Sequence, residues 1–486
     1  MSAVDRSKNI LIFADGTGQA GGLRPDQRLS NVYKLYRATR NGPESPIDPA
    51  EQVAFYDAGL GTDADAGQVR LRFLRTLRKF FSSAMGTGIS TNIVECYAAI
   101  LKHYEPGDRI YLFGFSRGAY TARCVGGVLN LCGVPTHDAD GKPVPRYGRG
   151  LMRVAREAVL QVYEHGAGKD RGKYEPERKE KAQRFRLKYG CDIDGQSNVV
   201  PYFIGVFDTV AALGAKGLLR FVMVSLLVAL TILLPCAVLY GFDLGRYIVP
   251  YLGGLILAGV YQLFKQHYRS IRDFPNPGDF RWHFAGWRSG FYDRLLGRRV
   301  RYARHALSID ERRADFARVE WGVKGQHVAH EPGEPEWLRQ VWFAGCHSDI
   351  GGSYDEDESR LSDIALSWML EQTAELPHPL LVDRSRLHLF PSAAGMQHCE
   401  IQRMLDRYPD WVPQGWRIAW KAKSRIEARG APLHRSVYER FDLASVRHCG
   451  EVRPYRPDSL ALDVRLTRYY AVAETASCPQ SLPHET

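Results

Sequence analysis

Before residue 216, short apolar runs alternate with amphipathic stretches. The runs from Ile10 to Ala14, Arg109 to Phe115 and Val199 to Phe207 predict buried strands, and a later run, Val341 to Gly345, predicts a fourth. Between the first two runs, apolar residues repeat at helical spacing within Thr91 to Tyr104, and another helix is expected from Arg117 onward. Alternation of this kind is typical of a mostly parallel sheet flanked by helices, so the pattern predicts an α/β fold.

A long uncharged stretch interrupts this alternation. Phe221 to Phe242 contains no charged residue, and Tyr247 to Phe264 is a second uncharged run rich in small residues. A run of the first length reaches about 30 Å as a helix, the thickness of a bilayer's hydrocarbon core. The sequence therefore predicts a transmembrane helical hairpin. Lys and Arg cluster at both of its ends, which favours placing the ends in the cytoplasm. A buried helical hairpin in a lid and a hairpin dipping into one leaflet are the alternatives.

This hairpin divides the chain into four expected parts. Residues 1–216 and 269–375 would form the two parts of the α/β core, and residues 217–268 the inserted hairpin. Residues 376–486 form a C-terminal region with no motif that predicts a role. Residues 166–190 are highly charged and are expected to be a solvated loop or frayed helix.

The amino-acid composition excludes few functional classes of protein. The 486 residues carry a formal charge of +11, which is too diffuse to indicate nucleic-acid binding without an accompanying motif. The nine cysteines include no C-x-x-C pair, and we expect reduced thiols. The first residues contain no signal-peptide core, so a cytosolic start is expected.

The clearest candidate for catalysis is a serine between two glycines. Gly114 to Gly118 fits G-x-S-x-G, in which a sharp strand-to-helix turn raises the serine, here Ser116, above the sheet. A serine needs a base and an orienting carboxylate to become a nucleophile. Asp208, at the end of the third predicted strand, is the expected carboxylate. His347, in a glycine-bracketed loop after the fourth strand, is the expected general base, with His305 and His330 as weaker rivals.

The oxyanion hole should use backbone N–H groups. Arg117, which follows the nucleophile, and Gly16 and Thr17, in the turn after the first strand, are the expected donors. Three carboxylates at strand ends leave a metal site as an alternative, formed by Asp15, Asp208 and Asp349. The triad chemistry itself requires no metal or organic cofactor.

Several motifs together resemble a known family. They are Phe13 to Gly18, Gly59 to Thr62, Gly114 to Arg123, Phe207 to Val210, Arg304 to Arg313, Phe343 to Tyr354 and Leu361 to Leu370. The chain resembles an α/β-hydrolase family that includes bacterial type VI secretion phospholipase effectors and many fungal proteins. The resemblance implies ester hydrolysis on phospholipids by Ser116, Asp208 and His347. The inserted hairpin departs from the family pattern.

These observations lead to one functional hypothesis with two alternatives. We expect a membrane-anchored serine hydrolase of lipid esters, held in a bacterial inner membrane with its catalytic domain on the cytoplasmic side. A lipid or phospholipid would be its substrate, and the bilayer its partner through the hairpin. A type VI secretion lipase toxin is the first alternative, and a catalytically silent interaction module with a hydrolase fold is the second.

Overall fold

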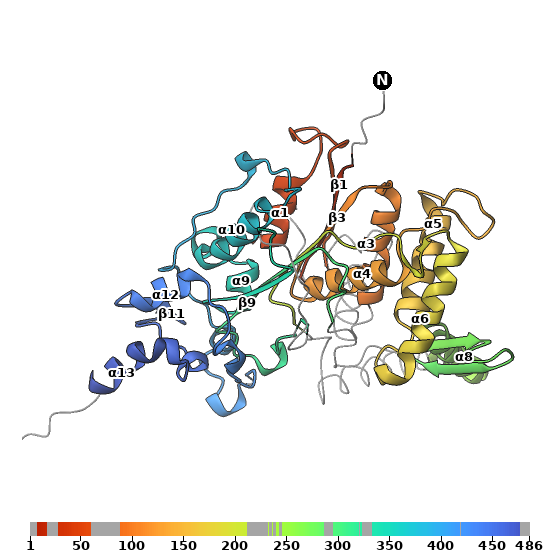
Figure 1. Cartoon of the computed structure of the whole chain (residues 1–486). Helices are drawn as coiled ribbons and strands as arrows, with labels where there is room; N and C mark the ends of the chain where they lie inside the picture. Colours follow the sequence, from red (N-terminus) through yellow and green to blue (C-terminus); the bar gives the residue numbers. More distant parts are fainter. Residues whose placement is uncertain are drawn as a thin grey trace, which may run out of the picture.

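A six-stranded parallel sheet forms the centre of the protein in a computed structural model (Figure 1). The structure describes residues 7–16, 28–59, 88–210, 232, 236, 240–242, 245–285, 295–319, 321–322, 333–417 and 419–476. The sheet has the strand order β10-β9-β6-β3-β1-β2. Its strands are β1 (Asn9–Ala14), β2 (Gln52–Asp57), β3 (Arg109–Phe115), β6 (Phe203–Phe207), β9 (Tyr302–Ser308) and β10 (Leu338–Phe343). The expected α/β fold with a mostly parallel sheet is confirmed.

Helices cover both faces of the sheet, as the alternating side chains of the strands require. Ile10, Ile12 and Leu112 pack on one face with α3 (Ile89–His103), α4 (Arg117–Cys132), α5 (Gly148–Arg156), the π-helix η2 (Glu157–Tyr163) and α6 (Arg171–Lys188). Leu11 and Phe13 pack on the other face with α1 (Asn31–Thr39) and α10 (Arg360–Ala374). Figure 1 shows these two layers on opposite sides of the sheet.

The C-terminal region packs on the edge of the sheet formed by β9 and β10. Leu307 and Trp342 share an apolar cluster with Val437, Phe441 and Leu460. Its helices are α11 (Glu400–Leu405), α12 (Arg435–Asp442) and α13 (Thr467–Ala476), and its strands are β11 (Val446–His448) and β12 (Glu451–Arg453). The 3-10 turns in the described part of the chain are η3 (Gly245–Tyr247), η4 (Ala314–Phe316), η5 (Glu356–Glu358), η6 (Arg384–Arg386), η7 (Gln414–Trp416), η8 (Ile426–Ala428), η9 (Asp458–Leu460) and η10 (Val464–Leu466).

The expected membrane hairpin is where the structure departs most from the sequence prediction. The run from Phe221 to Phe242 lies almost entirely outside the described residues. The second run forms α8 (Ile248–His267), whose uncharged part ends at Phe264 and is about 26 Å long. Among the helices that the structure describes, none has both the length and the apolar character to cross a bilayer. The second membrane span predicted at Tyr247 to Phe264, and the inner-membrane location that depended on it, therefore have no support among the described helices.

Helix α8 continues into a small antiparallel hairpin, β7 (Tyr268–Arg272) and β8 (Phe280–Phe284). This hairpin is hydrogen-bonded to α6, which lies in the charged stretch predicted to be a solvated loop or frayed helix. Lys181 donates to the carbonyl of Ser270 (2.8 Å), and Arg184 donates to that of Arg272 (2.8 Å). The charged stretch is an 18-residue helix because several of its polar side chains have such partners. A last two-stranded pair, β4 (Asp192–Ile193) and β5 (Gln196–Ser197), follows α6.

Candidate active site

Ser116 lies on a strained turn between β3 and α4. Its backbone has φ 58° and ψ −121°, a conformation that a non-glycine residue rarely adopts. A Cβ at position 114 would lie 2.4 Å from the carbonyl oxygen of Gly118, and one at position 118 would lie 2.0 Å from that of Ala14. Both glycines are therefore sterically required, which is the reason for the G-x-S-x-G spacing.

Asp208 and His347 are hydrogen-bonded although 139 positions separate them in the chain. Asp208 follows β6, and His347 begins the short helix α9 (His347–Gly351) after β10. His347 Nδ1 lies 2.6 Å from Asp208 Oδ2, and both side chains are buried. The other ring nitrogen, Nε2, is also buried and has no hydrogen-bond partner among the described residues. An imidazole held at Nδ1 with Nε2 unoccupied can accept a proton from a hydroxyl group.

The strand order brings Ser116 to the same edge of the sheet as this pair. β3 and β6 are neighbours, and the N–H of Ser116 donates to the carbonyl of Phe207, the residue before Asp208 (3.2 Å). The ring of Phe115, the residue before Ser116, lies 4.7 Å from the His347 ring, and Phe316 lies 5.2 Å from it on another side. Aromatic contacts thus fix the orientation of the imidazole.

Arg425, in the C-terminal region, forms a two-pronged ion pair with Asp208. Its Nη1 lies 2.6 Å from Oδ1 and its Nη2 lies 3.2 Å from Oδ2. The same guanidinium donates to the carbonyls of Ser308 and Phe316 (3.1 and 2.7 Å). Burial favours the protonated carboxyl, but Arg425 and His347 outweigh it and hold the pKa of Asp208 well below its usual range. The carboxylate therefore stays ionised. Sequence reasoning missed Arg425, because no local motif surrounds it.

The C-terminal region also holds the loop that carries His347. Asp349 Oδ2 accepts the N–H of Cys346 (2.9 Å), and its Oδ1 lies 2.7 Å from His398 Nδ1. Asp310 Oδ2 accepts the N–H of Gly345 (2.7 Å) and the hydroxyl of Tyr455 (2.8 Å). Two C-terminal side chains thus brace the residues on both sides of the histidine.

The turn after β1, expected to supply oxyanion donors, is organised by Asp15. The N–H of Gly16 donates to Asp15 Oδ1 (2.7 Å), and the hydroxyls of Ser30 and Tyr56 donate to Oδ2. Burial raises the pKa of Asp15 to about 6, although these three bonds lower it. In this state the Gly16 N–H is therefore directed at a carboxylate. Arg117 begins α4, next to Ser116, and Thr17 lies outside the described residues.

The alternatives raised by the sequence fare differently. His305 Nε2 accepts the N–H of Thr209 (3.2 Å), and burial lowers the pKa of His305 to about 3, so it is a neutral structural residue. His330 lies outside the described residues. Asp15, Asp208 and Asp349 each belong to a separate hydrogen-bond network, and within the described ranges they do not form a metal-ligand group.

The fold and this edge of the sheet define an α/β protein with a serine raised between two glycines and a histidine–aspartate pair nearby. Residues 8–372 match the family model described as the catalytic domain of Tle1-like type VI secretion phospholipase effectors, and the chain belongs to this family. The family resemblance expected from the motifs is confirmed. Lipid ester hydrolysis is the class of activity that the family description implies.

Individual relatives add little beyond the family. An uncharacterized protein of Saccharomyces cerevisiae, YEL023C, is 30% identical over 212 residues, which are 43% of this chain and 27% of that protein. An uncharacterized protein structure from Pseudomonas aeruginosa is 16% identical with a TM-score of 0.33, covering 79% of this chain and 48% of that one. The Tle1 effector bound to the VgrG spike of the type VI secretion system is 16% identical with a TM-score of 0.30, covering 73% and 52%. The chain thus aligns with about half or less of each of these proteins.

Proposed function

We propose that this protein is a serine hydrolase that cleaves carboxylic ester bonds of phospholipids. The observation that carries the proposal is the 2.6 Å bond between His347 Nδ1 and Asp208 Oδ2, with Nε2 left without a partner among the described residues. Membership of a phospholipase effector family supports the lipid substrate. The residues that perform the chemistry are proposed to be Ser116, His347 and Asp208.

In this mechanism the Ser116 hydroxyl attacks the acyl carbonyl while His347 Nε2 takes its proton. The histidine then returns the proton to the leaving alcohol, and water activated by the same nitrogen clears the acyl-enzyme. Asp208 keeps the imidazole in the required tautomer and stabilises its cation, while Arg425 keeps Asp208 ionised. The developing oxyanion would be bound by the N–H of Arg117 and by the turn containing Gly16 and Thr17, in which Asp15 would have to release the Gly16 N–H.

A fluorophosphonate probe tests this proposal without knowledge of the exact substrate. We expect labelling of the intact protein on Ser116, and loss of that labelling together with phospholipid ester hydrolysis in Ser116→Ala. The matched control is Ser385→Ala, which removes an exposed serine hydroxyl that donates to Asp383 and should keep both signals. A folded Ser116→Ala protein that is still labelled and active would refute the assignment.

We also propose that α8 and β8 bring the protein to a lipid surface without requiring a membrane span. Val249, Leu257 and Tyr261 on α8 are 77%, 72% and 65% exposed, and Trp282 on β8 is 56% exposed. Cationic side chains stack on aromatic rings in the same region: Arg246 on Tyr247, Lys265 on Tyr261 and Arg272 on Phe280. Exposed aromatic and apolar side chains beside cations suit the interface of an anionic membrane.

Vesicle sedimentation tests this lipid contact. Leu257→Glu should lower the fraction bound to vesicles of an anionic phospholipid by roughly tenfold, because it places a carboxylate in the apolar surface. Leu187→Glu is the matched control, since Leu187 is 64% exposed and belongs to α6, outside α8 and β8. Equal binding by both variants would contradict the assignment of this surface.

A further inference from the structure

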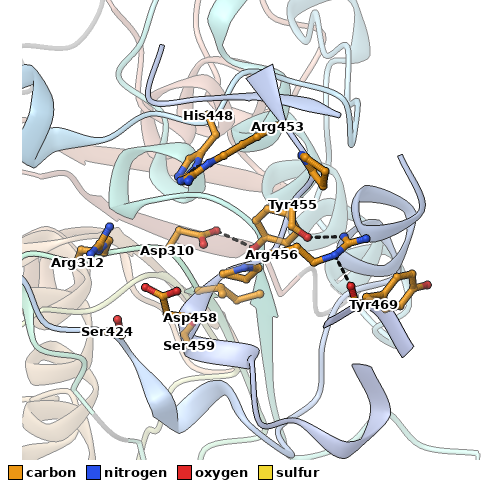
Figure 2. A pocket seen from close by; sticks show the side chains of 13 residues that line it. Asp310, Arg312, Ser424, His448, Arg453, Tyr455, Arg456, Asp458, Ser459 and Tyr469 are labelled. Carbon is orange, nitrogen blue, oxygen red and sulfur yellow. Dashed lines mark hydrogen bonds between the residues drawn. The ribbon is translucent and has the colours of Figure 1, made fainter. Parts of the chain in front are cut away.

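A cavity of about 450 Å³ lies between the segment after β9 and the C-terminal region (Figure 2). The segment after β9 contributes Ile309, Asp310 and Arg312 to the lining. The C-terminal region contributes Ser424 and residues of the 448–469 segment. None of Ser116, Asp208 and His347 is among its lining residues. Its volume is that of a small-molecule site.

Three arginines give this cavity a positive lining. Arg312 is exposed, and its guanidinium makes no hydrogen bond or ion pair within the described part of the chain. Among the described residues, Arg456 donates to the carbonyls of Phe441, Tyr455 and Tyr469 and to no carboxylate. Arg453 donates to His448, and the nearest carboxylate described for it is Glu451, at 3.8 Å. Figure 2 shows these guanidinium groups around the same space.

The carboxylates at the cavity do not pair with these cations. Asp310 accepts hydrogen bonds from the N–H of Gly345 and the hydroxyl of Tyr455, and burial raises its pKa. Asp458 is exposed at the cavity, and no ion pair of its side chain is described. Burial, Arg453 and two further arginines lower the pKa of His448 to about 4, so this ring remains a neutral neighbour in a positive surrounding.

The buried hydroxyl of Ser459 is a second, independent reason to expect a ligand in this cavity. Ser459 lines the cavity and is only 4% exposed, yet its Oγ has no hydrogen-bond partner in the described structure. A buried polar atom without a partner is unfavourable, and most such atoms in folded proteins are bonded to something. A ligand oxygen in the cavity would satisfy this group.

We propose that this cavity binds the phosphoryl group of a small organic phosphate. A phosphoryl group offers several acceptor oxygens and up to two negative charges, and guanidinium groups bind it through pairs of N–H donors. Arg312 and Arg453 would supply charge, and Ser459 would donate its hydroxyl. The phosphoryl group could come from a free metabolite or from a phospholipid headgroup, since both carry the same chemistry. This site is independent of the proposed hydrolase, although Tyr455, Asp310 and Gly345 connect its wall to the loop of His347.

Isothermal titration of the full chain with glycerol 3-phosphate tests the proposal, with glycerol and added sodium chloride as controls. We expect saturable binding of glycerol 3-phosphate but not of glycerol. Arg312→Gln should weaken it by roughly tenfold or more, as loss of a charge-assisted contact does. Because Arg312 has no protein partner among the described residues, its replacement should leave folding intact. Arg407→Gln is the control, since Arg407 is an exposed arginine of the same region outside the cavity lining.

Further variants and vesicles make each outcome decisive. Ser459→Ala should also weaken binding, by a smaller factor. Vesicles containing phosphatidic acid that bind in an Arg312-dependent way would identify a lipid headgroup as the source, and binding of glycerol 3-phosphate alone would identify a free phosphate. Absence of both, or equal binding by Arg312→Gln and Arg407→Gln, would overturn the proposal. These readouts do not depend on ester hydrolysis, so the site and the hydrolase proposal fail separately.

Discussion

Two buried histidine–carboxylate pairs, His347 with Asp208 and His165 with Glu177, stand in different surroundings. The first has a separation of 2.6 Å and the second 2.8 Å, and all four side chains are buried. His347 stands at the carboxyl edge of the sheet, where Ser116 also lies. His165 lies after η2, where its Glu177 partner comes from α6.

The surroundings of His165 indicate a structural role for this residue. Burial, with nearby Lys181 and Arg269, lowers the pKa of His165 to about 3, so the ring stays neutral. His283 on β8 accepts the N–H of Gly166 (3.0 Å), which links the β7–β8 hairpin to the core. The possible metal-ligand atoms of His165, Glu177 and His283 lie within 4.8 Å of one another, close enough to bind a metal ion. The positive charges of nearby Lys181 and Arg269 disfavour a metal cation at this place. A histidine–carboxylate pair therefore acquires its role from its neighbours.

Replacing each histidine by alanine should separate the two roles and gives the largest expected effect. His347→Ala should lower ester hydrolysis by about 10³-fold or more, because it removes the proposed general base. His165→Ala should keep the activity of the folded protein and lower the free energy of unfolding by about 1–3 kcal/mol, since Glu177 loses a buried partner. Activity per folded molecule and thermal unfolding are the measurements. The comparison fails if the activity losses are reversed.

Arg425→Met tests the feature that most distinguishes the first pair. Removal of one partner of a buried ion pair costs about 3–5 kcal/mol, so a large fall in the free energy of unfolding is expected. Because Arg425 depresses the pKa of Asp208, the stability from this carboxylate is present above its unfolded pKa, near 4, and is lost as the pH falls below it. The variant should therefore lose less stability than the native chain on acidification.

Melting temperatures between about pH 3 and pH 7 measure both effects. Arg435→Met is the matched control, because Arg435 is an exposed arginine at the start of α12. Arg425→Lys keeps the charge but not the two-pronged geometry, and it should restore only part of the stability. An unchanged acid slope in Arg425→Met would show that Arg425 does not set the protonation of Asp208.

The sequence predicted the elements whose patterns are local. β3 was predicted at Arg109 to Phe115 and is found there, and the glycines around Ser116 are required by contacts within one turn. β9 was not predicted as a strand, because its buried Arg304 and His305 break the apolar pattern. Arg304 is tolerated inside because Gln372 and two carbonyls accept its N–H groups. Such compensation comes from distant residues and leaves no local signal.

The same reason explains which parts of the site could be foreseen. The role expected for His347 followed from a strand end and a glycine-rich loop, whereas Arg425 lies 217 positions from Asp208 in a region without a recognised motif. The second expected membrane span was not found among the described helices, and its uncharged run ends at Phe264, before the polar last turn of α8. Residues within local motifs could be predicted from the sequence, whereas partners far apart in the chain could not.

His398 gives the smallest expected effect and tests how the C-terminal region holds the loop that carries His347. Its two ring nitrogens lie 2.7 Å from Asp349 Oδ1 and 3.2 Å from Glu358 Oε2. Burial alone would lower the pKa of His398, but the two carboxylates outweigh it and raise the pKa. The charged ring therefore adds stability below its unfolded pKa, about 6.5, which is lost as the pH rises through the folded pKa. Relative to the native chain, the free energy of unfolding of His398→Gln should be about 1 kcal/mol lower at pH 6, with a smaller difference at higher pH.

Chemical denaturation at a series of pH values measures this difference, with the exposed His388→Gln as control. A difference between the native chain and His398→Gln that does not change with pH would mean that the ring braces Asp349 as a neutral hydrogen-bond partner, unlike a charged clamp.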